Sequence, residues 1–183
     1  MDRKAALQQI HDEISSCTRC ELYKTRTNAV PGEGPVNATV MFIGEAPGAV
    51  EDRTGRPFVG RSGELLTKLI QEIGLRREDV FITSVLKSRP PGNRTPRREE
   101  VNACISYLDR QIEVIRPRII VLLGGVAVSS VIGPWRMSEA HGRLHEANGH
   151  TYFMTYHPAA ALRFPTTMNV MRNDFKKLKS ELN

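Results

Sequence analysis

The fold is decided by a stretch that reads Thr39-Val40-Met41-Phe42-Ile43-Gly44-Glu45-Ala46-Pro47-Gly48 and continues as a loop to Gly60. Its first five residues form an apolar run rich in β-branched side chains, which predicts a buried strand. Between residues 44 and 66, five glycines and two prolines fix the shape of the backbone. Ligands bind at the carboxyl ends of strands in an open α/β sheet, because unpaired backbone N–H groups meet there. We therefore expect a shaped pocket at this loop.

Further strand and helix patterns follow in alternation along the chain. Strands are predicted at 80–84, 118–123 and 152–154, and helices at 2–15, 62–73, 97–115 and 168–182. Asn148-Gly149 predicts a two-residue hairpin turn before the last strand. This alternation predicts a single domain over residues 1–183, a three-layer α/β/α sandwich with a central, mainly parallel four-stranded sheet. Three loops, at 44–60, 84–93 and 157–163, should converge at the strand ends.

Charge is distributed unevenly along the 183 residues. The formal net charge is +6, which suits a polyanionic partner. Between residues 80 and 98 there are five cations and no carboxylate: Lys87, Arg89, Arg94, Arg97 and Arg98. A solvated basic loop is one interpretation of this segment. Because its prolines and glycine keep it out of a helix, and because it follows a predicted strand, we favour a surface that contacts phosphates.

The three cysteines leave several interpretations open. Cys17 and Cys20 form a Cys-x-x-Cys pair, which occurs in thioredoxin-like redox sites, zinc sites and iron–sulfur sites. A redox pair is expected just after a strand, whereas this pair precedes the first predicted strand. The only further thiol is Cys104, and its place in a helical pattern favours an ordinary buried residue. An odd number of cysteines also argues against a disulfide framework.

The chain shows no signal for a membrane or for export. No apolar run approaches the length of a membrane span, and the first residues lack the cationic-then-apolar order of a secretory signal. We therefore expect an intracellular, cytoplasmic protein with no membrane partner.

Four blocks of the sequence occur in a fixed order. They are Gly44-Glu45-Ala46-Pro47-Gly48 with Glu51-Asp52, then Gly55-Arg56-Pro57-Phe58-Val59-Gly60, then Lys87-Ser88-Arg89-Pro90-Pro91-Gly92-Asn93-Arg94, and finally Tyr156-His157-Pro158-Ala159. Together they resemble the signatures of the family-four uracil-DNA glycosylases, the thermophile-type enzymes that contain an iron–sulfur cluster. The likeness extends from Cys17 to the last helix.

The resemblance implies a uracil-DNA glycosylase-like fold and a role in base excision repair. Such an enzyme hydrolyses the N-glycosidic bond of uracil in DNA and, being monofunctional, leaves an abasic site. The implied partner is uracil-containing DNA, single- or double-stranded, bound by a monomer at the prokaryotic nucleoid.

The resemblance also implies roles for four candidate catalytic residues. His157 would donate a hydrogen bond from a neutral imidazole to the uracil O2, where negative charge develops in the transition state. Glu51 corresponds to the family's pocket-floor acid, which excludes the thymine methyl and helps to hold water. Asn93 occupies a family position implicated in catalysis, and Glu45 is the other nearby carboxylate. Each carboxylate could instead be a surface or loop-capping residue, and His157 a structural histidine.

The base-binding pocket implied by the resemblance adds Gly44, Ala46, Phe58 and Ser84. Phe58 is the candidate stacking ring, with a core phenylalanine as the alternative. Ala46 stands where the best-known uracil glycosylases carry a water-activating aspartate. At position 84 the family has an asparagine that reads uracil, and the shorter Ser84 would weaken or broaden base recognition.

On the DNA side, the resemblance and the basic segment together implicate five residues: Lys87, Arg89, Arg94, Leu162 and Arg163. Leu162 would be a wedge that enters the minor groove beside the flipped base. Lys87 carries an amine that could in principle form a Schiff base, but a phosphate contact fits the family better.

The family's four cluster ligands fall at Cys17, Cys20, position 88 and Cys104, so the resemblance implies a structural 4Fe-4S cluster. The family has a cysteine at position 88, where this chain has Ser88, a harder oxygen ligand; the cluster would be more labile, or bound by three cysteines with an open or oxygen-ligated iron. Two alternatives stay open, the first because of the departures at positions 84 and 88 and the second from another class of protein. One is a nucleic-acid-binding iron–sulfur homologue with weak activity, or with altered specificity for hypoxanthine or xanthine. The other is a redox or metal protein built on the three cysteines.

Overall fold

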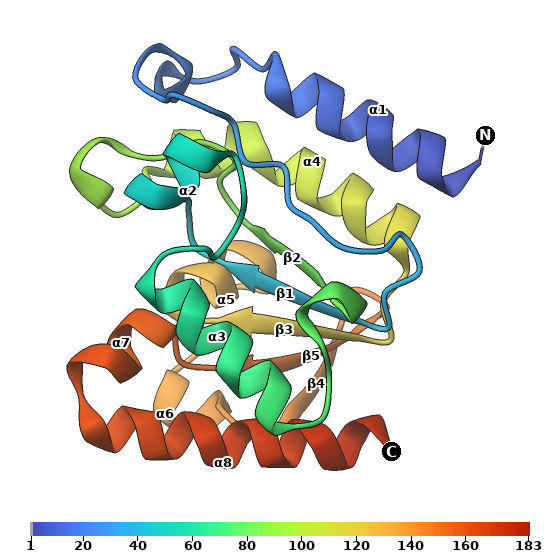
Figure 1. Ribbon diagram of the computed structural model, residues 1–183, viewed down its shortest axis with the longest axis vertical. Helices are drawn as coiled ribbons and strands as arrows, with labels where there is room; N and C mark the ends of the chain where they lie inside the picture. Colours follow the sequence, from blue (N-terminus) through green and yellow to red (C-terminus); the bar gives the residue numbers. More distant parts are fainter. Residues whose placement is uncertain (1) are drawn as a thin grey trace.

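A five-stranded sheet lies at the centre of the computed structural model, which describes residues 2–183 (Figure 1). The strands are β1 (Val40–Gly44), β2 (Phe81–Ser84), β3 (Ile119–Leu123), β4 (Leu144–Ala147) and β5 (His150–Thr155). Their order across the sheet is β2-β1-β3-β5-β4. Strands β2, β1, β3 and β5 run parallel to one another, and β4 pairs antiparallel with β5.

The sheet has five strands rather than the four predicted, because the first arm of the predicted hairpin, β4, also belongs to the sheet. Its residues alternate between exposed and half-buried positions, so it lacks the continuous apolar run of a buried parallel strand. The hairpin itself is confirmed. Ala147 pairs with His150 across a two-residue turn, and both Asn148 and Gly149 have positive φ, as a type I′ turn requires.

Eight α-helices are found in residues 2–183. They are α1 (Arg3–Ser15), α2 (Ala49–Thr54), α3 (Arg61–Glu72), α4 (Arg98–Ile115), α5 (Gly125–Val131), α6 (Met137–Ala140), α7 (Pro158–Arg163) and α8 (Pro165–Leu182). Short 3-10 turns lie at Glu21–Lys24, Arg77–Asp79 and Pro91–Asn93. The last helix starts three residues before its predicted start, because Pro165 occupies the first turn, where its missing N–H costs nothing.

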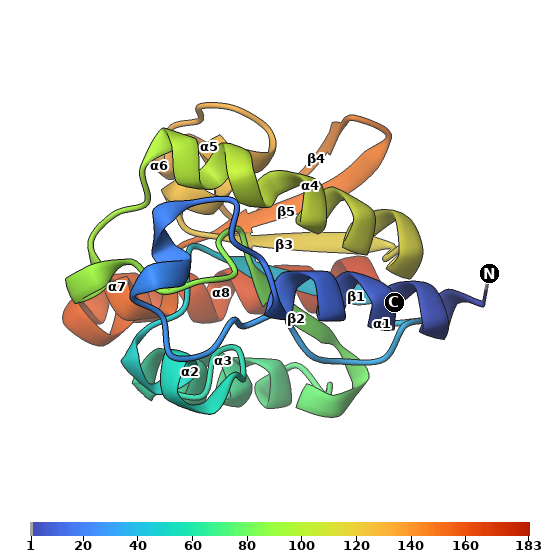
Figure 2. The ribbon, with the colours of Figure 1, turned by 90° about the horizontal axis from the view of Figure 1, so that it is seen from above.

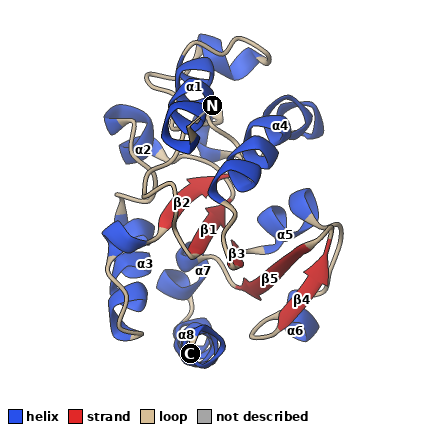
Figure 3. Ribbon diagram, turned by 90° about the vertical axis from the view of Figure 1, so that its right-hand side faces the viewer, coloured by secondary structure: helices blue, strands red, loops and turns tan. Residues whose placement is uncertain are grey.

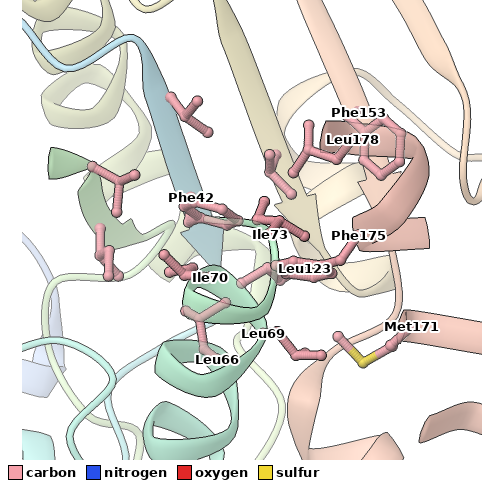
Figure 4. Packing of buried hydrophobic residues seen from close by; sticks show 14 of the residues in the cluster. Phe42, Leu66, Leu69, Ile70, Ile73, Leu123, Phe153, Met171, Phe175 and Leu178 are labelled. Carbon is pink, nitrogen blue, oxygen red and sulfur yellow. The ribbon is translucent and has the colours of Figure 1, made fainter. Parts of the chain in front are cut away.

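Helices cover both faces of the sheet (Figures 2 and 3). Alternate residues of β1 point to opposite faces, as in any strand. Val40 and Phe42 pack with α3, α7 and α8, whereas Met41 and Ile43 pack with α1, α4 and α5. Figure 4 shows side chains of β1, α3 and α8 meeting in the first of these clusters, where the rings of Phe42 and Phe175 stack 6.0 Å apart.

The carboxyl ends of the parallel strands lie at one edge of the molecule, beside α2 and α7 (Figure 1). The three predicted loops all begin at this edge. No helix within residues 2–183 combines the length and the apolarity needed to cross a bilayer.

Candidate active site

A pocket of about 540 Å³ lies at the carboxyl ends of the strands. Segments from three loops form it, as expected: the chain after β1, the chain after β2, and the junction of β5 with α7. Its lining includes eight of the predicted residues: Glu45, Ala46, Glu51, Phe58, Ser84, Asn93, Arg94 and His157. Residues far apart in the sequence are thus brought together because parallel strands end at the same edge.

His157 begins α7 as its N-cap residue. Its Nδ1 accepts a hydrogen bond from the backbone N–H of Ala159 at 3.1 Å. Burial lowers the pKa of His157 to about 4, against an ordinary value of 6.5, so the imidazole is neutral at pH 7. Because Nδ1 is an acceptor, the single ring proton of the neutral form is on Nε2. The ring is therefore a fixed, uncharged hydrogen-bond donor in the pocket wall.

Phe58 forms an aromatic wall of the same pocket. Its ring centroid lies 5.7 Å from that of His157, and its ring packs directly on Gly44. A Cβ added at Gly44 would lie 2.4 Å from Phe58 Cζ, so only glycine permits this approach. Arg77 fixes the backbone here by donating to the carbonyl oxygens of Pro57 and Phe58 at 2.5 and 2.8 Å.

Glu51 holds the loop between α2 and α3 in place. Its Oε1 accepts from the backbone N–H groups of Val59 and Gly60 at 3.0 and 2.8 Å, and its Oε2 accepts from Gly48 at 3.1 Å. Both carboxylate oxygens are therefore engaged by the protein itself. The loop-capping alternative is confirmed for this residue, and its expected contact with the base or with water stays a prediction.

Glu45 and Ser84 lie at the inner end of the pocket. Ser84 ends β2 and pairs in register with Gly44 at the end of β1. Burial raises the pKa of the Glu45 carboxyl, and the backbone carbonyl of this residue accepts from Leu86. Glu45 is among the residues that line the pocket, where a carboxylate can orient a water molecule.

The basic segment is less available to phosphates than its composition suggested. Lys87 is 2% exposed, and its Nζ donates to Thr83 Oγ1, Ser84 O and Gln111 Oε1 at 2.6–2.8 Å. The phosphate contact predicted for Lys87 is therefore wrong, because its chain turns back under β2 rather than out to solvent.

Two arginines of the segment have partners as well. Both terminal nitrogens of Arg94 bind the buried carboxylate of Glu100, at 2.9 and 2.6 Å. Arg89 donates to Asn93 Oδ1 at 2.7 Å. Neither contact removes the cation from the surface, so phosphate binding by Arg89 and Arg94 stays a prediction.

Two exposed apolar side chains lie at the end of α7, one in its last turn and one directly after it. Leu162 is 42% exposed and Phe164, which sequence reasoning missed, is 53% exposed. Arg163 lies exposed between them. The sequence signal that could have found Phe164 is its place two residues after the predicted wedge, Leu162.

The family of the chain follows from comparison with known proteins. A model of the uracil DNA glycosylase superfamily matches residues 31–182. A type-4 uracil-DNA glycosylase of Saccharolobus solfataricus is 50% identical and covers 96% of this chain and 86% of its own length. A second type-4 enzyme, from Thermotoga maritima, is 42% identical and covers 97% and 95%. A type-5 enzyme of Pyrobaculum aerophilum is 38% identical over 80% and 72%. The chain belongs to the type-4 uracil-DNA glycosylases.

A second feature of this type-4 glycosylase is a small cavity of about 10 Å³ away from the base pocket. Its lining includes the four predicted ligand positions: Cys17, Cys20, Ser88 and Cys104. Three cations also line it, namely Arg19, Arg26 and Lys87. Arg26 donates from Nη1 to Ser88 Oγ at 3.0 Å. Three sulfurs, one hydroxyl and two guanidinium groups suit an anionic group bound through sulfur, whereas the Nζ of Lys87 is engaged by Thr83, Ser84 and Gln111.

The same cavity argues against a single zinc ion. Ligands of one tetrahedral zinc lie only about 3.8 Å apart, given Zn–S bonds of about 2.3 Å. Within residues 2–183, no three histidine, cysteine, aspartate or glutamate side chains are gathered closely enough to hold one metal ion. A cluster does not need such convergence, because each ligand binds a different iron. The four positions therefore offer no site for a single zinc ion, and the iron–sulfur cluster that the resemblance implies stays a prediction.

Two partly buried histidines of this glycosylase predict how its stability depends on pH. Burial lowers the pKa of both His157 and His11 to about 4. Between about pH 6.5 and pH 4 the unfolded chain binds protons that the folded chain does not, so the free energy of unfolding falls as the pH is lowered through this window. Urea unfolding at pH 7, 6 and 5 should show this loss.

The matched variants of that experiment are His157→Gln and His11→Gln. Each should reduce the slope of the free energy of unfolding against pH, because each removes one group that must gain a proton on unfolding. A slope that is unchanged in both variants would contradict the assignment of these two neutral histidines.

Proposed function

We propose that this chain hydrolyses the N-glycosidic bond of uracil in DNA and leaves an abasic site for base excision repair. The observation that carries the proposal is the neutral His157, whose Nε2–H is a fixed donor in a pocket walled by Phe58. The match to type-4 enzymes over nearly the whole chain supports it.

The steps follow from what these side chains can do. Uracil, flipped out of the DNA, stacks on Phe58, with its O2 accepting from His157 Nε2. As the glycosidic bond breaks, its electron pair moves onto the base and negative charge grows at O2, while the sugar becomes oxocarbenium-like. A fixed neutral donor stabilises that charge more in the transition state than in the bound substrate. Water held near Glu45 then adds to the sugar carbon and loses a proton to solvent, and the departing uracil anion takes up a proton from solvent.

Binding to DNA is proposed to involve the surface around the pocket mouth. Leu162 would fill the space left by the flipped base, and Arg89, Arg94 and Arg163 would contact phosphates. We propose a monomer that acts on single- and double-stranded DNA.

The direct test is release of uracil from a single-stranded oligonucleotide and from a G:U duplex, followed by alkaline cleavage at the abasic site. Strand cleavage at uracil, and none at thymine in a matched G:T duplex, is the expected result. A folded protein that releases no uracil would contradict the proposal. Parallel oligonucleotides with hypoxanthine or xanthine test whether Ser84 has broadened base recognition.

We also propose that Cys17, Cys20, Ser88 and Cys104 hold a structural 4Fe-4S cluster. When bound, the cluster would supply a rigid cross-link between the segment before β1, the loop after β2 and α4. What supports this is the shared cavity of these four residues and the cations around it. No step of the base-release reaction passes through this group.

Replacing Ser88 by cysteine is expected to slow the loss of iron from the anaerobically purified protein, because thiolate is the softer ligand for iron. The measurement is iron and acid-labile sulfide per chain before and after incubation with a chelator. Ser129→Cys is the matched control, since it adds an exposed thiol on α5 away from the cavity. Finding no iron in wild type or in Ser88→Cys would contradict the cluster.

A further inference from the structure

A buried carboxylate lies outside the pocket and has no part in the steps above. Asp174 of α8 is 1% exposed. Its Oδ2 accepts from Thr155 Oγ1 at 2.8 Å, and both of its oxygens lie 3.0 Å from His141 Nδ1. Burying a carboxylate is costly unless it is hydrogen-bonded, and the contacts with Thr155 and His141 offset this cost for Asp174.

These partners hold the two residues that precede His157. Thr155 is the last residue of β5, and its hydroxyl binds Asp174 directly. Tyr156 packs its ring against that of His141, with centroids 5.2 Å apart. Thus Asp174 and His141 between them fix both side chains of the segment that leads into His157.

The opposite side of this segment is also fixed. The carbonyl of Thr155 accepts from the backbone N–H of Gly124 at 2.8 Å. A Cβ on Gly124 would lie 3.0 Å from His157 Cβ, so the end of β3 packs tightly on His157 itself. The backbone at residue 157 is therefore held from β3 on one side and from α8 on the other.

We propose that Asp174 and His141 are positioning residues that set the place of the His157 imidazole in the base pocket. This inference rests on the proposed function, because it concerns the donor of that reaction. Neither residue lines the pocket, so both act through Thr155 and Tyr156. Displacing a reacting group by about 1 Å can cost about 100-fold in rate, which is the scale expected here.

The test compares three substitutions with one matched control. Thr155→Val removes the hydroxyl while keeping the shape, Thr155→Ser keeps the hydroxyl, and Asp174→Asn removes the charge. Thr151→Val is the control, because Thr151 lies on the same strand and also donates to a carboxylate, Glu146 Oε1 at 2.7 Å, far from His157. We measure kcat and KM for uracil release, the melting temperature, and the imidazole nitrogen resonances of His157.

Thr155→Val and Asp174→Asn are expected to lower kcat by about 10–100-fold, to change KM by less than about threefold, and to shift the His157 resonances. Thr155→Ser and Thr151→Val should stay within about threefold of wild type. Folded Thr155→Val or Asp174→Asn protein with wild-type kcat and wild-type resonances would overturn the proposal, as would an equal loss in Thr151→Val.

The resonances separate this inference from the proposed function. A wild-type protein that releases no uracil contradicts the function, but the His157 resonances of Thr155→Val and Asp174→Asn still decide whether Asp174 positions that ring. Unchanged resonances overturn the positioning role, and shifted resonances support it. Asp174→Asn is isosteric, so it is expected to fold even if Thr155→Val does not, but its one acceptor oxygen cannot serve both Thr155 and His141.

Discussion

Replacing His157 by alanine is expected to lower the rate of uracil release by about 10²–10³-fold, because one preorganised donor to a developing oxyanion is typically worth that much. The effect should be in kcat rather than KM, since the hydrogen bond strengthens only as charge appears on the base. The measurement is single-turnover release of uracil from a G:U duplex at pH 7.

Two further variants separate the donor from other roles of this residue. His157→Asn keeps a side-chain acceptor for the N-terminus of α7, so it should restore any stability lost in His157→Ala without restoring the rate. His11→Ala removes another partly buried, neutral histidine that lies away from the base pocket. A His157→Ala rate within tenfold of wild type, or an equal loss in His11→Ala, would mean that the donor lies elsewhere.

Replacing Glu51 by alanine is expected to lower the free energy of unfolding by about 2–4 kcal/mol, because it leaves the N–H groups of Gly48, Val59 and Gly60 without their acceptor. For a protein of this size, that corresponds to a fall in melting temperature of roughly 5–15 °C. The rate of uracil release should fall as well, since Phe58 lies in the segment that this carboxylate holds.

Glu64→Ala is the matched control, because Glu64 is an exposed carboxylate in the first turn of α3. It should leave both the melting temperature and the rate near their wild-type values. Glu51→Gln, which keeps one acceptor oxygen, should lie between wild type and Glu51→Ala. A melting temperature of Glu51→Ala equal to that of Glu64→Ala would show that the three contacts contribute nothing.

The arrangement of strands and loops was predictable because it depends on local patterns. The apolar run before Gly44 and the glycine-rich loop after it placed the pocket at the correct edge, and the Asn148-Gly149 pair placed the hairpin. The edge strand β4 was missed because an exposed strand carries no continuous apolar signal.

The direction of individual side chains was not predictable from local composition. The count of cations between residues 80 and 98 suggested free positive charge, but the partner of Arg94 is Glu100, just past the end of that window. The contacts of Asp174 with His141 and Thr155 join residues 33 and 19 positions apart, so no sequence spacing indicates them.

The burial of Lys87 bears on whether this residue could nick the DNA strand at an abasic site. Burial lowers the pKa of Lys87 to about 7, so part of the amine is unprotonated and nucleophilic near neutral pH. Its Nζ nevertheless lies beneath Ser84, bound to three oxygens and shut off from any deoxyribose in the pocket. An imine between this amine and the sugar C1′ is therefore sterically blocked, and the β-elimination that nicks a strand has no starting point at Lys87.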